Sequence, residues 1–178
     1  MAEVIKLHTG NSSRQAGLQA VEMLERVRIS EPARVAACYP HELSGGMLQR
    51  AMIAMALSCS PALLFADEPT TALDVTIQAQ ILRLLRELQK QFDMAVVFIT
   101  HDLGIVAQIC ERVMVMYAGA FVESASVQDL FAKPLHPYTQ GLMGAIPRLD
   151  IDQEDLAIIP GGIPDLAQPV EGCRFFGR

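Results

Sequence analysis

The stretch from residue 62 to residue 102, "ALLFADEPTTALDVTIQAQILRLLRELQKQFDMAVVFITHD", decides the expected fold class of this chain. Residues 62–67 are five apolar residues followed by an aspartate, which is typical of a strand buried on both faces. Residues 74–92 carry an amphipathic helical pattern, and residues 94–102 form a second apolar strand with a polar end. The order strand, helix, strand predicts an α/β fold in which a mostly parallel sheet carries flanking helices.

The rest of the chain adds helices and one hairpin. The apolar stripe of the helix expected over 74–92 consists of Ile77, Ile81, Leu84, Leu85, Leu88 and Phe92. Ser12 or Ser13 is the expected N-cap of a helix over 12–27, because serine accepts a hydrogen bond from the free N–H groups of a first turn. The other expected elements are helices at 45–58 and 103–110, a connector at 31–40, strands around a turn at Ala118-Gly119, and short helices within 126–134 and 136–146.

Composition excludes several classes of protein. The 178 residues are 51% hydrophobic and 19% charged, so the chain is long enough and apolar enough to form a packed core. A net charge of −6 argues against nucleic acid as a partner. The longest apolar run, residues 51–57, is too short to cross a membrane, and the first ten residues hold no apolar core of the signal-peptide type. Four widely spaced cysteines do not form a disulfide framework, and we expect Cys59 and Cys110 to fill small spaces in the core.

The first candidate for chemistry is the pair Asp67-Glu68, which ends the first strand. Ligands of parallel sheets gather at the carboxyl ends of the strands, where two adjacent carboxylates are placed together. In a phosphoryl-transfer site Asp67 would hold Mg²⁺, and Glu68 would orient or deprotonate the attacking water. The alternative is a polar strand end followed by a turn at Pro69.

The second candidate is the step Ser44-Gly45-Gly46 at the start of the helix expected over 45–58. Each glycine weakens a helix by roughly 1 kcal/mol relative to alanine. Two glycines at this point therefore suggest a contact that requires positions without side chains. A helix N-terminus attracts phosphate through its free N–H groups and its partial positive charge. Ser44 either caps the helix or donates to a phosphate oxygen, and both readings stay open.

The end of the second strand and the start of the long helix add one more candidate each. His101 follows a buried strand at the sheet edge expected to hold Asp67 and Glu68, so it could reach a terminal phosphate or the attacking water. A lone histidine is more often structural. Asp74 either caps the helix that starts at Val75, which its position favours, or reaches across to a partner.

Three motifs in this order resemble the ATP-binding subunit of an ABC transporter. "LSGGMLQR" (43–50) is similar to the signature motif, "LLFADEPTTALD" (63–74) to the Walker B strand and D-loop, and "FITHD" (98–102) to the switch histidine. The segments "YPHELSGGMLQRAMIAMAL", "HPYT" and "IPGG" resemble the dipeptide/oligopeptide branch. The resemblance runs from about residue 7 to the end and implies a partial P-loop NTPase fold with part of the helical subdomain.

The departure from the family pattern is equally informative. The chain contains no G-x-x-x-x-G-K-[S/T], and none of its three lysines, Lys6, Lys90 and Lys133, follows a glycine. The glutamine loop and the adenine-stacking aromatic of the family are absent as well. The chain therefore looks like the C-terminal portion of a longer subunit. We expect it to bind MgATP very weakly and not to hydrolyse it alone.

The resemblance assigns roles residue by residue. In ABC dimers each ATP lies between the P-loop of one subunit and the signature of the other. Ser44, Gly45, Gly46 and Gln49 would therefore contact ATP held by a partner, with Asp74 in the D-loop. The residues that would serve the chain's own ATP are Glu68 and His101 as catalytic groups and Asp67 as the Mg²⁺ ligand.

The implied organisation is a partial ABC ATPase domain over 1–147 and a transporter-type extension over 148–178. Within the domain, 1–58 would be a helical subdomain remnant and 44–124 the part from signature to switch. Implied partners are a second ATP-binding subunit and transmembrane permease subunits at the cytoplasmic face of the membrane. Residues 8–43 would lie near the membrane partner. Cys173 alone would not hold an iron–sulfur cluster and is expected to be a solvated thiol.

Two rival functions remain. The chain could be a non-catalytic fragment that only docks on an intact ATPase, or a soluble ABC ATPase of DNA repair or translation. The missing P-loop favours the first rival, and the acidic charge and the "HPYT" segment weigh against the second. Without the N-terminal strands of the family, the apolar strands at 62–67 and 94–99 would also leave an exposed sheet. We therefore expect marginal solubility or self-association.

Overall fold

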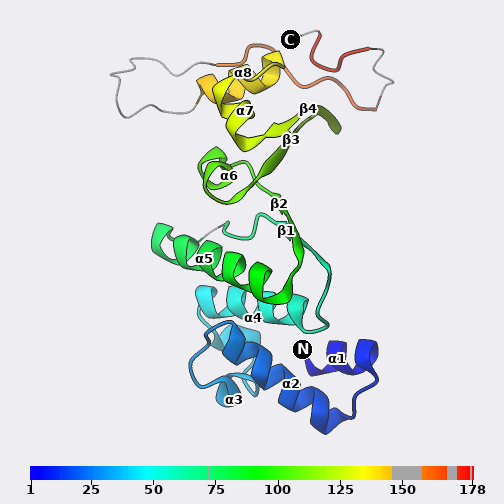
Figure 1. Ribbon diagram of the computed structural model, residues 1–178, viewed down its shortest axis with the longest axis vertical. Helices are drawn as coiled ribbons and strands as arrows, with labels where there is room; N and C mark the ends of the chain where they lie inside the picture. The colour runs from blue at the N-terminus through cyan, green and yellow to red at the C-terminus, as the bar shows by residue number, and fades with distance from the viewer. Residues whose placement is uncertain (72, 146–157, 168–171, 177) are drawn as a thin grey trace. The chain divides into compact units, whose positions relative to one another are not determined.

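A computed structural model describes residues 1–71, 73–145, 158–167, 172–176 and 178. The chain divides into two compact units, Met1–His101 and Asp102–Arg178, and each is described by itself (Figure 1).

The first unit combines helices with one pair of parallel strands. Its elements are α1 (Ala2–Thr9), α2 (Ser13–Arg26), α3 (Pro32–Val35), the 3-10 helix η1 (Pro40–Glu42), α4 (Gly45–Leu57), β1 (Leu63–Asp67), α5 (Val75–Phe92) and β2 (Ala95–Ile99). Strands β1 and β2 pair in parallel, with Leu63 opposite Ala95 and Asp67 opposite Ile99. Helix α5 connects them, which confirms the predicted strand–helix–strand unit. Ser12 is the N-cap of α2 and forms a capping box with Gln15.

The core of the first unit lies between α2, α4 and α5. The residues of α5 that are buried in it are Ile81, Leu84, Leu85 and Leu88, which confirms most of the predicted stripe. They pack with Leu57 of α4 and with Val27, and both of these residues are fully buried. Each such side chain contributes about 1.5–3 kcal/mol relative to an exposed one. Helix α1 was not predicted, and its Ile5 packs on Ala16 and Ala20 of α2.

The two-stranded sheet is buried on one face only, so the prediction of a strand buried on both faces is wrong. Leu64, Val96 and Phe98 pack against the core, because α4 and α5 cover that face. On the other face Leu63 is 45% exposed and Phe65 is 64% exposed. The expected exposure of apolar sheet surface is therefore confirmed at Leu63 and Phe65.

The second unit is built on an antiparallel hairpin. Its elements are α6 (Leu103–Ile109), β3 (Arg112–Tyr117), β4 (Ala120–Ser126), α7 (Val127–Ala132) and α8 (Pro137–Gly144). The predicted turn between β3 and β4 is confirmed: Ala118 and Gly119 have φ values of 49° and 77°. Positive φ at both central residues is what a type I′ hairpin turn requires.

Part of the C-terminal segment packs on α8 within the second unit. The side chain of Ile159 lies so close to α8 that a Cβ on Gly141 would come within 2.7 Å of it. Arg178 donates to the carbonyls of Ile159 at 3.2 Å and Pro160 at 2.7 Å. The ring of Phe175 contacts those of Tyr117 and Tyr138. Of the extension predicted over 148–178, residues 148–157, 168–171 and 177 lie outside the described residues.

The cysteines differ from expectation in one case. Cys59 is exposed, so its prediction as a core filler is wrong. Helix α4 ends at Leu57, the neighbouring Ser58 takes the buried position at 1% exposure, and Cys59 turns outward. Cys110 is half-buried, and burial raises the pKa of its thiol. Cys173 is exposed, as predicted.

Candidate functional site

Two acidic residues occupy the carboxyl end of the parallel pair. Asp67 is the last residue of β1 and is exposed. Glu68 follows with a φ of 45°, a left-handed conformation that residues other than glycine seldom adopt. Its N–H donates to the carbonyl of Ile99 in β2 at 2.9 Å. The backbone therefore turns sharply at Glu68 while it remains tied to the neighbouring strand.

The carboxylate of Glu68 is bonded to His101. Oε1 lies 2.6 Å from Nδ1 of His101 and also accepts from the His101 backbone N–H at 3.3 Å. Oε2 accepts from the hydroxyl of Thr71 at 3.0 Å. The His101 side-chain bond first and the Thr71 bond second lower the pKa of Glu68, so the group is ionised at neutral pH. Because an ionised carboxylate only accepts, Nδ1 of His101 carries the proton in this bond.

The structure thus brings Glu68 and His101 together at the edge where parallel pairing predicts them. Thr71 was missed by sequence reasoning. The signal was present, because a hydroxyl three residues after a turning carboxylate is within reach of it.

The Ser44-Gly45-Gly46 step forms the start of α4. Ser44 is the N-cap, and its Oγ accepts from the N–H of Met47 at 3.4 Å. A Cβ on Gly46 would lie 3.3 Å from Cγ2 of Ile77, so close packing of α4 against α5 explains this glycine. A Cβ on Gly45 would meet no heavy atom within 4 Å. The described residues therefore give no packing reason for Gly45, and its backbone is open to approach from outside.

Two other candidate residues are engaged within the chain. Asp74 is the N-cap of α5 and accepts from the N–H groups of Thr76 and Ile77 at 3.1 and 3.0 Å, which confirms the capping reading. The side-chain amide of Gln49 donates to the carbonyl of Pro69 at 2.6 Å. One N–H of Gln49 is therefore committed inside the first unit, next to Glu68.

Asp67 suits a hard cation by the chemistry of its carboxylate. Among the described residues, no group of three or more His, Cys, Asp or Glu side chains could hold a metal ion. Mg²⁺ at Asp67 would therefore take its other ligands from water and from substrate phosphate, as this ion commonly does. The residues present fit such a shared site and do not form an all-protein cage.

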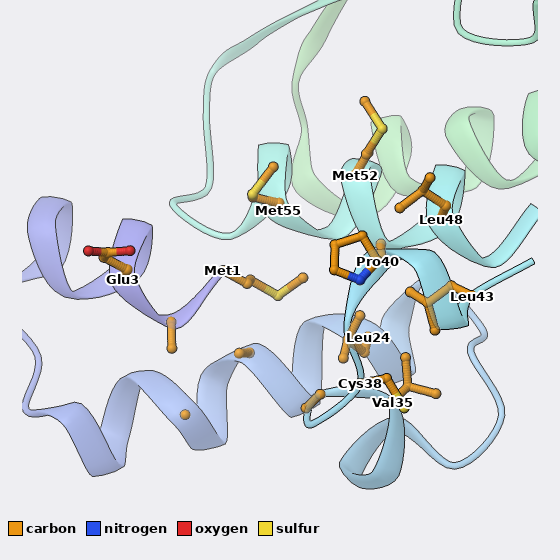
Figure 2. Close-up of a pocket in the computed structure, with 15 residues that line it drawn as sticks. Met1, Glu3, Leu24, Val35, Cys38, Pro40, Leu43, Leu48, Met52 and Met55 are labelled. Atoms are coloured by element: carbon orange, nitrogen blue, oxygen red, sulfur yellow. The ribbon is translucent and has the colours of Figure 1, made fainter. Parts of the chain in front are cut away.

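A second feature of the first unit is an apolar cavity of about 490 Å³. Figure 2 shows Met1 extending from the start of α1 into the space between α2 and α4, with Leu24 below it and Met52 and Met55 above. Glu3 is the one acidic residue among those that line the cavity. Sequence reasoning missed the cavity, because α1 forms one of its walls and was not predicted. None of the described helices is long and apolar enough to span a bilayer.

Comparison with protein families gives two matches. Residues 3–71 match the family described as ABC transporter, and residues 122–178 match the one described as Oligopeptide/dipeptide transporter, C-terminal region.

Curated relatives match the chain along its whole length. The chain is 59% identical to the probable peptide ABC transporter ATP-binding protein y4tR of Sinorhizobium fredii, over 100% of this chain and 53% of that protein. It is 53% identical to the oligopeptide transport ATP-binding protein OppD of Haemophilus influenzae, over 100% of this chain and 55% of that protein. The chain thus spans about half the length of these relatives.

Solved structures share the fold. The dimeric structure of MJ0796, a bacterial ABC transporter cassette, is 33% identical, with a TM-score of 0.56 over 66% of this chain and 49% of that one. The structure of cbiO1 from Clostridium perfringens, part of the ABC transporter complex cbiONQ, is 29% identical, with a TM-score of 0.61 over 71% of this chain and 49% of that one. The expected α/β fold, partial with respect to an ABC cassette, is confirmed.

Proposed function

We propose that the chain belongs to the ABC transporter ATP-binding proteins of the oligopeptide/dipeptide branch, and that it acts as part of a subunit that couples ATP hydrolysis to peptide import. The observation that carries this proposal is the Glu68–His101 pair beside Asp67 at the carboxyl end of two parallel strands. The boundary between an ATPase domain over 1–147 and an extension over 148–178 stays a prediction.

Glu68 would act as the general base. Its carboxylate is ionised at neutral pH, so it can accept a proton from the water that attacks the terminal phosphate. His101 holds one carboxylate oxygen through Nδ1, and its largely exposed ring leaves Nε2 accessible. Nε2 would donate to a phosphate oxygen in the imidazolium form, in which both ring nitrogens carry a proton. Asp67 would hold Mg²⁺, which neutralises developing charge on the phosphates when it is bound.

The start of α4 would act on ATP held by a second ATP-binding subunit. The open backbone at Gly45 supports this role, because an approaching phosphate oxygen would meet free N–H groups and no side chain. Ser44 and Gly46 flank that position, and Asp74 lies in the loop that would face the partner. Gln49 was predicted to join this set, and one of its two amide N–H groups is already bonded to Pro69.

The membrane partners would be permease subunits, which would place the chain at the cytoplasmic face of the membrane. The apolar cavity lined from α1, α2 and α4 supports a contact of this kind, since methionine-lined cavities accept apolar side chains of varied shape. Most of its lining residues fall at the start of the chain, where the membrane contact over residues 8–43 was predicted.

A second candidate function has its own supporting observation. The exposed apolar face at Leu63, Phe65 and Ile99 is what a fragment that docks on an intact ATPase would present.

The experiment pairs this chain with an intact peptide-transport ATP-binding subunit whose own signature serine is replaced by arginine. If Ser44, Gly45 and Gly46 act on a partner's ATP, adding this chain restores ATP hydrolysis. The Ser44→Arg variant should give no rescue. The Glu68→Gln variant should rescue fully, because Glu68 would serve the other ATP. Absence of rescue, or equal rescue by Ser44→Arg, would refute the proposed role.

A further inference from the structure

The first turns of α4 contact the start of the segment that joins β1 to α5 and the first turn of α5 itself. At the start of this segment, Gln49 donates to the carbonyl of Pro69 at 2.6 Å. Beyond its end, Gly46 lies against Ile77 in the first turn of α5. These contacts fall on one helical face, since Gln49 follows Gly46 by three positions. Helix α4 therefore contacts the chain on both sides of the loop that carries Glu68.

The bond to Pro69 fixes the backbone directly after Glu68. Proline has no N–H, so its carbonyl is the only backbone group through which a hydrogen bond can hold it. The preceding residue is Glu68, with its φ of 45°. A left-handed residue that is not glycine persists only where surrounding contacts hold it. The backbone of this turn is held by the bonds from Glu68 N–H to Ile99 and from Thr71 N–H to the carbonyl of Glu68 at 3.1 Å, and the bond from Gln49 to Pro69 ties it to α4.

We propose that Gln49 is a positioning residue: by holding the Pro69 carbonyl it keeps Glu68 in the left-handed turn that brings its carboxylate to Nδ1 of His101. The geometric part stands on the contacts of this chain alone, whereas its catalytic meaning rests on the proposed function of Glu68. Gln49 also lies one turn from Gly45, so the helix end that would face a partner's phosphate holds the catalytic loop of its own chain. The side chain of Gln49 thereby links the helix start that would contact a partner's ATP to the loop that carries Glu68.

The neighbouring Arg50 provides a matched control. Its guanidinium donates to the carbonyl of Val27 at 3.0 Å and to Oε1 of Gln80 at 3.1 Å, so it ties α4 to other parts of the first unit. Neither bond involves the loop that carries Glu68. Replacing Arg50 therefore weakens the packing of α4 without touching the Pro69 carbonyl.

The test reads the tautomer of His101 by ¹³C and ¹⁵N NMR of the full chain, at one fixed pH where the imidazole is neutral. The wild-type protein should show the Nδ1–H form. Gln49→Leu and the isosteric Gln49→Glu both lack the donor and should lose that signature. Gln49→Lys should retain it, because its ammonium can still donate to Pro69. Arg50→Leu should leave it unchanged.

Three results would overturn the proposal. They are an Nδ1–H signature that survives both donor-free variants, its loss in Arg50→Leu as well, and its absence from the wild-type protein. Unchanged circular dichroism in Gln49→Glu shows that its effect is not unfolding. A failed rescue of a partner's ATP hydrolysis, with the tautomer behaving as expected, would refute the proposed function and leave the positioning role of Gln49 intact.

Discussion

The imidazole of His101 meets the carboxylate of Glu68 at 2.6 Å, although 33 positions separate them in the chain. Parallel pairing of β1 and β2 produces this contact, because it sets the carboxyl ends of both strands at one edge. The bond forms within the first unit and needs no element outside it.

The Glu68 carboxyl should titrate below the usual range of a glutamate. The bond from His101 and then that from Thr71 lower its pKa. A pKa lowered in the folded state stabilises the protein above the ordinary glutamate pKa, and this contribution is lost as the pH falls through the folded value. Titration by ¹³C NMR checks the shift, and His101→Ala should move the pKa upward. A Glu68 pKa at or above its usual range would contradict the observed bonds.

The isolated chain should bind MgATP very weakly and should not hydrolyse it. The sequence contains no G-x-x-x-x-G-K-[S/T], the motif that holds nucleotide phosphates in this family. Asp67 and Glu68 would therefore have no bound nucleotide to act on when the chain is alone. Calorimetric titration with MgATP and a phosphate-release assay measure the two expectations. Micromolar binding by this chain alone would show that the expectation is wrong.

The two glycines of α4 should respond differently to alanine. Gly45→Ala places its methyl group in open space and should raise helix stability by up to about 1 kcal/mol. Gly46→Ala brings the methyl group to 3.3 Å from Ile77, which must shift, so any gain should be smaller or reversed. Urea unfolding ranks the two variants. In the rescue assay Gly45→Ala should be inactive in spite of its stability, and full activity would exclude Gly45 as a phosphate contact.

Replacing a core leucine with alanine should lower the free energy of unfolding far more than the same change on the exposed face of the sheet. Leu88 is 1% exposed and Leu63 is 45% exposed. Leu88→Ala should lower the free energy of unfolding by about 2–5 kcal/mol, since it removes buried contacts and leaves a cavity. Leu63→Ala should change it by about 1 kcal/mol or less, because much of its surface already meets water. Equal losses in urea titrations would mean that Leu63 is covered in solution.

The open sheet face should cause self-association. Phe65 and Ile99 are 64% and 48% exposed on the side of the sheet away from the core. The double variant Phe65→Thr, Ile99→Thr keeps residues suited to strands and removes apolar surface, so it should shift light scattering toward the monomer. A wild-type chain that is already a sharp monomeric species with cooperative unfolding would contradict this expectation.

The features that could be predicted from the sequence are those that depend on residues close together in the chain. The caps at Ser12, Ser44 and Asp74 depend on residues three positions apart at most, so the sequence displays them. The strand–helix–strand unit followed from hydrophobic periodicity. The Gln49–Pro69 bond could not be predicted, because it joins positions 20 apart that only tertiary packing brings together. The burial of both faces of the first strand was predicted wrongly for a related reason, since an apolar run does not reveal whether both of its faces are covered.

The close contact between Gly141 and Ile159 lets the returning segment pack directly on α8. Ile159 occupies the space that a Cβ at position 141 would take. Any other residue at position 141 would therefore push Ile159 away from the helix. The missing Cβ at one helical position is thus what allows the chain to pack back against its own helix.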